Sequence, residues 1–167
     1  MEEENIITTD EWKLYEKGKN YNVQQGLYKD TEENYDFYHG NQWKGAKLGS
    51  IQPITLNVIR PTVKYKVGVL NNKLYQVVFN PSVYSSYQEG EELENRCKAL
   101  NNYTNKIWEA EQVNSKVREV LKDACINGEG IVHSYEEDGK IKVETVDKTN
   151  IYYGNENDSD IQAQPYD

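Results

Sequence analysis

Residues 113–146, VNSKVREVLKDACINGEGIVHSYEEDGKIKVETV, contain the two signals that decide the fold of this chain. In the first half, apolar residues recur at helical spacing, and Asn127-Gly128 is a typical helix stop, because glycine adopts the left-handed conformation that ends many helices. Further on the period falls to two, and Asp138-Gly139 lies between two strand-like runs, 131–135 and 141–146. This dipeptide is a strong signal for a tight hairpin turn. The stretch therefore predicts a helix and then a small antiparallel hairpin, which places the chain in the α+β class.

Helical periodicity also precedes this stretch. Between Ser86 and Asn127 two apolar stripes are out of phase around 109–112. This shift predicts either one long bent helix or a pair of helices, with the junction near Asn114 or Ser115.

Two more helices are expected near the N-terminus. The first, capped by Thr9 or Asp10, runs to about Gln25, since a side-chain oxygen at this position can accept from the first free amides. The second begins at a capping box formed by Asp30 and Glu33, which have the required spacing.

The remaining stretches are short. A helix is predicted from Pro61 to Leu70, because proline suits the first turn of a helix. Residues 74–79 and 149–153 are rich in β-branched and aromatic residues, so both are predicted as strands. Residues 1–8 are expected to be disordered.

The composition leaves little material for a hydrophobic core. The chain has 167 residues, enough for one domain. Leu, Ile, Val and Phe make up only about 22% of it, close to the level at which disorder sets in. Fourteen Tyr and three Trp partly offset this, because each buries a large area while keeping a polar end in water. We therefore expect an apolar surface that material outside the chain completes.

The net charge of −9 argues against a free-standing nucleic-acid binder, which uses Lys and Arg to neutralise phosphates. The three arginines, Arg60, Arg96 and Arg118, are also far apart in the sequence. The negative charge is compatible with a surface that DNA slides past without binding tightly. No apolar run approaches the roughly 18 residues of a membrane span, and the acidic start lacks the regions of a secretory signal.

No residue pattern indicates an enzyme or a zinc site. His39 and His133 are the only histidines, and neither lies in a nucleophile motif; one is expected at a helix C-terminus and the other in a strand. Cys97 and Cys125 are expected to be small buried hydrophobic residues rather than a disulfide. The four residues together lack the close paired spacing of zinc ligands.

Two further patterns are weak. Asn155, Asn157 and Ser159 alternate like calcium ligands, but the glycine and the final glutamate of such a loop are missing. Gly128-Glu129-Gly130 follows a predicted helix instead of preceding one, which indicates a turn and not a phosphate site. We therefore expect no catalytic, cofactor-binding or metal-binding residue.

Several segments occur in an order that has a counterpart in one protein family. They are 36–43 (DFYHGNQW), 57–61 with 64–70 (NVIRP and KYKVGVL), 121–130 with 146–155 (LKDACINGEG and VDKTNIYYGN), and 160–166 (DIQAQPY). The first resembles the FYxGxQW segment near the start of the portal proteins of tailed bacteriophages and prophages, and the others resemble later parts of the same family.

The resemblance implies a structural subunit of a ring, usually of twelve copies, at one vertex of the capsid. It implies no enzymatic activity, since the packaging ATPase belongs to the terminase. Implied partners are other portal subunits, the capsid, the terminase and head–tail adaptor proteins, with transient passage of DNA through the full ring and no membrane. The protein would be a virion component assembled in the bacterial host cytoplasm. Residues 1–167 would form one elongated, N-terminal, wing-like portion of the subunit, without its stem, clip and crown regions.

Two other functions stay open on the sequence alone. Exposed Tyr and Trp side chains also suit a small adaptor or carbohydrate-binding module, in which they would line one cleft. A hydrolase using Cys125 and His133 would need these two side chains within hydrogen-bonding distance.

Overall fold

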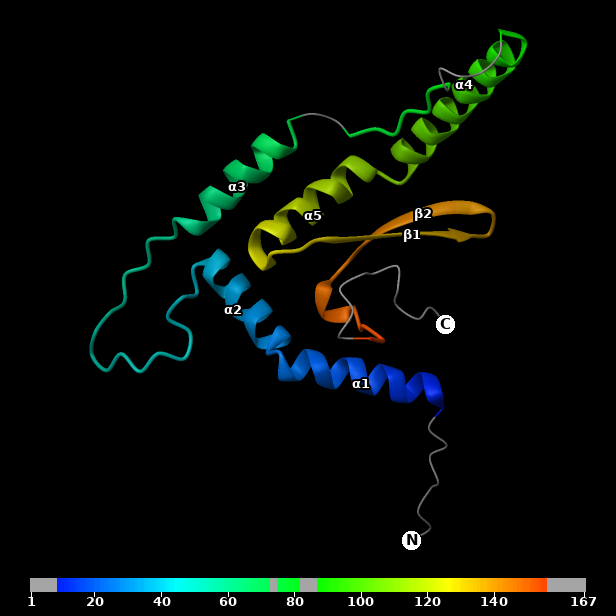
Figure 1. The fold of residues 1–167 in the computed structure, drawn as a ribbon. Coiled ribbons are helices and arrows are strands. Elements are labelled where there is room, and N and C mark those ends of the chain that lie inside the picture. The colour runs from blue at the N-terminus through cyan, green and yellow to red at the C-terminus, as the bar shows by residue number, and fades with distance from the viewer. Residues whose placement is uncertain (1–8, 73–74, 82–86, 156–167) are drawn as a thin grey trace. The chain divides into compact units, whose positions relative to one another are not determined.

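The computed structural model describes residues 9–72, 75–81 and 87–155. They contain five α-helices, one 3₁₀ helix and a two-stranded antiparallel sheet (Figure 1). The α+β class predicted from the sequence is therefore confirmed. Residues 1–8, expected to be disordered, lie outside the described ranges.

The chain divides into two units. The first runs to Arg60 and resumes at Asp147, so that it combines segments from both parts of the sequence. The second is the continuous stretch Pro61–Val146. Within the described ranges, no helix combines the length and the apolar character needed to cross a membrane.

The hairpin of the second unit forms as predicted. Strands β1 (Ile131–Glu137) and β2 (Lys140–Val146) pair in antiparallel register. Asp138 and Gly139 form the connection with φ angles of +52° and +72°. Two positive φ angles in succession give the turn whose twist matches that of the paired strands, which is why this dipeptide favours it.

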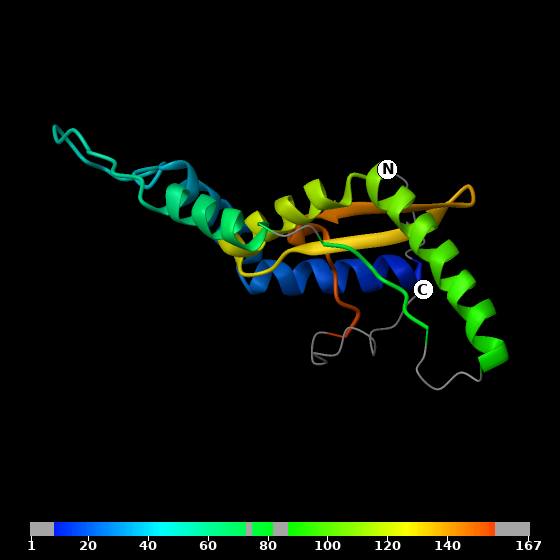
Figure 2. The same ribbon diagram turned by 90° about the horizontal axis from the view of Figure 1, so that it is seen from above.

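Helix α5 (Val113–Asn127) packs against both strands, and Figure 2 shows it running along the hairpin. It ends at Gly128, whose φ of +88° is the left-handed stop predicted from the sequence. A Cβ atom at Gly130 would lie 2.3 Å from the carbonyl oxygen of Val120. The passage from α5 into β1 therefore depends on a backbone approach that only glycine allows.

The predicted helix pair is present, with its break slightly earlier than expected. Helix α4 (Tyr87–Ala110) ends before Gln112, which adopts a left-handed φ of +50°, and Asn114 already lies inside α5. Glu111 at the break accepts hydrogen bonds from Lys116 of α5 at 3.1 Å and from Lys142 of β2 at 3.2 Å. These two lysines hold the pKa of the Glu111 carboxyl below its usual value. The break between α4 and α5 is thus held by ionic contacts of Glu111 with α5 and β2.

The strand predicted over 74–79 is wrong within its described part, 75–79, which is neither strand nor helix. Its backbone groups bond to side chains of the helices instead. Asn101 of α4 accepts from the Phe79 amide at 2.7 Å and donates to the Phe79 carbonyl at 3.0 Å. Asn114 accepts from the Tyr75 amide at 3.3 Å. These amide side chains hold both ends of the segment, and its exposed residues in between can bond to water, so the segment needs no neighbouring strand.

In the first unit, helix α1 (Asp10–Gln24) is capped by Thr9, whose hydroxyl accepts from the Trp12 amide. Helix α2 (Leu27–His39) begins earlier than the predicted capping box at Asp30. The reason is Gly26, whose left-handed φ of +73° lets the second helix start directly after the first.

The strand predicted over 149–153 is also wrong. Lys148–Asn150 forms a short 3₁₀ helix, η1, and the residues after it are irregular. The Ile151 carbonyl accepts from Asn22 of α1 at 2.9 Å, and the Tyr152 ring meets that of Tyr15 edge to face, with centroids 4.8 Å apart. This segment is therefore held by α1, and it pairs with no strand among the residues that the structure describes.

Helix α3 (Ile59–Leu70) contains Pro61 in its first turn, as predicted, and buries Val63 and Val67. The buried apolar set of the described residues is small: Tyr38, Val63, Val67, Cys97 and Val113. No described side chain is completely buried. The structure thus agrees with the small core expected from the composition.

Replacing Gly130 by alanine should destabilise the protein by roughly 1–3 kcal/mol, the usual result of forcing a side chain into a packed site. Gly68 of α3 is the matched control, because its Cβ would meet no atom within 4 Å. Gly68→Ala should stabilise the protein by roughly 0.5–1 kcal/mol. Urea denaturation followed by circular dichroism measures both, and a Gly130→Ala variant as stable as the wild type would contradict the close approach.

Removing the Asn101 side chain should release the 75–79 segment. In Asn101→Ala the Phe79 amide loses its acceptor, and we expect its hydrogen-exchange rate to rise about fivefold, since one such bond is worth roughly 1 kcal/mol. The neighbouring exposed Asn102 gives the control Asn102→Ala, which should leave this rate unchanged. Hydrogen exchange of the Phe79 amide, measured by NMR, tests this prediction. Equal rates in the two variants would show that Asn101 does not hold the segment.

Candidate functional site

The C-terminal end of α2 forms a turn that sets the start of the following loop. Gly40 has a left-handed φ of +88°. Its amide donates to the Phe37 carbonyl at 3.1 Å, and the Asn41 amide donates to the Asp36 carbonyl at 2.8 Å. These two bonds define the Schellman motif, in which glycine is the favoured left-handed residue. The segment 36–43 is therefore a helix end followed by a rigid turn.

The chain returns to this turn at Asn57. Its side-chain amide donates to the Tyr38 carbonyl at 2.9 Å, and its oxygen accepts from the Arg60 amide at 3.0 Å in the first turn of α3. A Cβ at Gly40 would lie 3.1 Å from the Asn57 Nδ2 and 3.4 Å from the Thr55 Cγ2. The intervening residues, named here the 41–58 loop, are thus fastened at their base.

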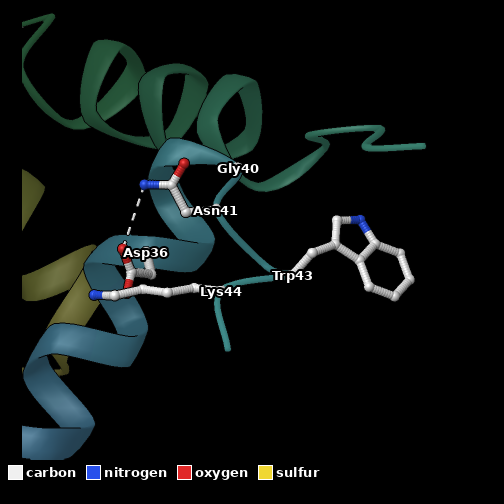
Figure 3. Close-up of a pocket in the computed structure, with 5 residues that line it drawn as sticks. All are labelled: Asp36, Gly40, Asn41, Trp43 and Lys44. Carbon is white, nitrogen blue, oxygen red and sulfur yellow. Dashed lines mark hydrogen bonds and ion pairs between the residues drawn. The ribbon is translucent and has the colours of Figure 1, made fainter. Parts of the chain in front are cut away.

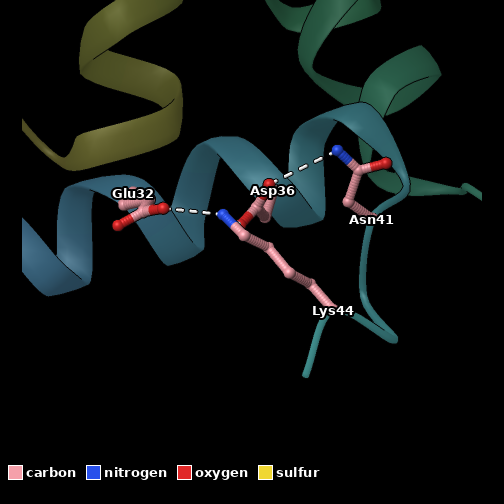
Figure 4. A network of polar contacts seen from close by, with 4 residues as sticks. All are labelled: Glu32, Asp36, Asn41 and Lys44. Atoms are coloured by element: carbon pink, nitrogen blue, oxygen red, sulfur yellow. Dashed lines mark hydrogen bonds and ion pairs between the residues drawn. The ribbon is translucent and has the colours of Figure 1, made fainter. Parts of the chain in front are cut away.

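A lysine joins the loop to α2 (Figure 4). Lys44 Nζ donates to the carboxylates of Glu32 at 2.6 Å and Asp36 at 2.7 Å, which lie one helical turn apart. Asn41 adds a hydrogen bond to Asp36 at 3.3 Å. The bond from Lys44 holds the pKa of Asp36 below its usual value, and the two carboxylates raise the pKa of Lys44. Both shifts favour the charged forms of Asp36 and Lys44 at neutral pH, so Asp36 is not poised for general acid–base catalysis.

Beside this network lies a shallow pocket (Figure 3). It is lined by Asp36, Gly40, Asn41, Trp43 and Lys44. The Trp43 indole points away from the ionic network, and 40% of the residue is exposed. One aromatic ring at the edge of an open pocket differs from the aromatic-lined cleft that a carbohydrate-binding module requires.

The second half of the 41–58 loop exposes large aliphatic side chains. The exposed fractions of Ile51, Ile54 and Leu56 are 70%, 86% and 78%. Val58, just before α3, is 59% exposed. A concentration of apolar side chains on the surface is typical of an interaction site. The loop is therefore the strongest candidate for a contact surface in the first unit.

The two histidines lie where the sequence predicts. His39 is the last residue of α2, and its ring centroid is 5.2 Å from that of Tyr38. His133 lies in β1, stacks on Tyr135 at 4.9 Å, and approaches the Glu144 carboxylate of β2 at 3.4 Å. Both positions are part of the packing of a secondary-structure element.

Both cysteines are free: Cys97 of α4 is buried and Cys125 of α5 is half-buried. In the described ranges, no three His, Cys, Asp or Glu side chains gather at a site that could hold a metal ion. Of the weak calcium pattern, Asn157 and Ser159 lie outside those ranges.

The ionic network formed by Glu32, Asp36 and Lys44 is not apparent from the sequence. The spacing of Glu32 and Asp36 could have indicated two carboxylates on one helical face, because residues four apart are neighbours there. Nothing in the sequence identifies Lys44 as their partner, because it is brought there by the turn at Gly40.

Lys44→Met should raise the pKa of Asp36 toward its ordinary value of 3.8. A carboxyl whose pKa is lowered by folding stabilises the native state above its ordinary pKa, and this contribution disappears as the pH falls. The free energy of unfolding of the wild type should therefore drop more steeply than that of Lys44→Met as the pH falls through about 4.

NMR titration of the Asp36 carboxyl carbon and urea denaturation at several pH values test this. Lys47→Met, in the same loop, is the control and should leave the Asp36 pKa unchanged. Identical titration of Asp36 in wild type and Lys44→Met would contradict the ion pair.

One protein family matches the chain over the segments that carry these features. The family model described as "Phage P22-like portal protein" matches residues 16–161, which include the C-terminal part of α1, all of α2, the 41–58 loop and the whole second unit. No curated protein is significantly similar to the chain. No solved structure is significantly similar either. The family match covers most of the chain, in agreement with the order of the segments noted in the sequence, and the chain therefore belongs to the phage P22-like portal protein family.

Proposed function

We propose that this chain contributes the N-terminal, wing-forming part of a portal ring, through which DNA enters the capsid during packaging and leaves it during ejection. Family membership gives the chain a structural role in the phage portal, as a virion component that assembles into an oligomeric ring with the capsid. The match over residues 16–161 is the observation that carries the proposal.

The negative net charge of the chain supports a role in a channel through which DNA moves. DNA that must move through a ring cannot be held tightly by its wall, and each lysine or arginine that neutralises a phosphate strengthens binding. The chain has 28 acidic and 19 basic residues, for a net charge of −9. Acidic surfaces repel phosphates, which favours sliding over binding.

The site chemistry supports a role without catalysis. The carboxylates of Glu32 and Asp36 are both bonded to Lys44, and His133 is engaged with Glu144 and Tyr135 within the hairpin. We propose that the energy for packaging comes from a separate terminase and that head–tail adaptor proteins bind the same ring. Assembly in the host cytoplasm and a ring of twelve copies belong to the same proposal.

The position of the protein in the particle tests the function. Antibodies raised against the chain should label a single vertex, at the junction of head and tail, when gently opened particles are viewed by immunogold electron microscopy. Antiserum depleted with the purified chain is the control. Label spread over the shell would contradict the portal assignment, and label on the tail fibres would favour the carbohydrate-binding alternative.

A further inference from the structure

The charges of this chain are unevenly distributed. Between Asp36 and Glu89 the sequence contains no acidic residue, but it contains Arg60 and five lysines. All 28 acidic residues lie outside this stretch. It is therefore a basic stretch in a chain whose net charge is −9. The 41–58 loop lies within this stretch and contains two of its five lysines: Lys44, which is bonded to Glu32 and Asp36 of α2, and Lys47, which faces solvent.

The loop combines this charge with exposed aliphatic side chains. Lys47 is exposed, and Ile51, Ile54 and Leu56 are exposed over most of their surface. Phosphate contacts use arginine, lysine and small polar groups, and gain nothing from large aliphatic side chains. A protein surface with an acidic rim and an apolar centre matches both properties of the loop.

The base of the loop is ordered before any partner binds. Asn57 ties it to the Tyr38 carbonyl, and Lys44 ties it to Glu32 and Asp36 of α2. A segment held in place loses less conformational entropy on association than a free one. This arrangement is suited to presenting the aliphatic side chains to a partner.

A ring of identical subunits requires two different surfaces on each copy, one that meets the preceding subunit and one that meets the next. A basic apolar loop on a chain that is otherwise acidic supplies such a complementary pair. We propose that the 41–58 loop docks on an acidic surface of a second copy of this chain. The inference rests on the proposed ring assembly and names the segment that makes its subunit contact.

Self-association of the purified chain tests the docking. Ile54→Ser/Leu56→Ser should weaken it at least about tenfold in sedimentation velocity, since removing central apolar contacts typically has this effect or a larger one. Lys47→Glu should weaken it as well, and added salt should weaken the wild type, because opposite charges attract less when screened. Val23→Ser, which removes a 57% exposed side chain from α1, is the matched control and should associate like the wild type.

Carbodiimide coupling identifies the contact directly, because it joins a lysine to a carboxylate in immediate contact. In a mixture of ¹⁴N- and ¹⁵N-labelled chains, we expect Lys47 to be linked to an Asp or Glu of a differently labelled copy. A monomeric wild type, loop variants that associate as strongly as the wild type, or links confined to one copy would overturn the proposal.

DNA binding is the alternative outcome. If Lys47→Glu abolished binding of a fluorescent DNA duplex and left self-association unchanged, the loop would be a nucleic-acid contact and the docking proposal would be wrong. Vertex labelling of particles does not depend on the loop variants. Failure of the docking therefore remains distinguishable from failure of the portal assignment.

Discussion

Side-chain amides of asparagine provide the hydrogen bonds that hold the irregular parts of this protein. Asn22 binds the carbonyl of Ile151, Asn57 closes the base of the 41–58 loop, and Asn101 binds both the amide and the carbonyl of Phe79. An asparagine side chain carries the same donor and acceptor as a peptide group, so it can replace a neighbouring strand. Because no side chain in the described ranges is completely buried, these contacts define the path of the backbone between helices.

The dependence on hydrogen bonds from distant asparagines explains which parts of the fold could be predicted from the sequence. The helix stop at Gly128 and the hairpin turn at Asp138-Gly139 depend on residues adjacent in the chain, and both are found as predicted. Residues 75–79 and 149–153 have the composition of strands, but their state depends on a distant amide. The chain contains 18 asparagines, and no local pattern marks the few that bind remote backbone. Strand propensity alone therefore gave the wrong result in both places.

The candidate site likewise has one part that could be predicted from the sequence and one part that could not. The turn at Gly40 belongs to the segment whose resemblance pointed to portal proteins, and the family match agrees with it. The ionic contact of Lys44 with Glu32 and Asp36 was not predictable, because it depends on how the turn directs the following residues. The role of the chain came from the order of short segments, while the structure added what those segments build: a fastened loop with exposed aliphatic side chains.

The first unit is built from two stretches separated in the sequence by the whole of the second unit. The hydrogen bond from Asn22 to Ile151 joins residues 129 positions apart. On the ribosome, α1 and α2 emerge long before the segment that completes their packing, whereas α5 and the hairpin are adjacent in the chain and can pair as they appear. Pairings between distant residues form slowly, because the intervening chain must first be brought together. The earliest-made helices of this protein are consequently among the last to reach their final surroundings, and during synthesis their unfinished surface stays exposed until the segment that begins at Asp147 has been made.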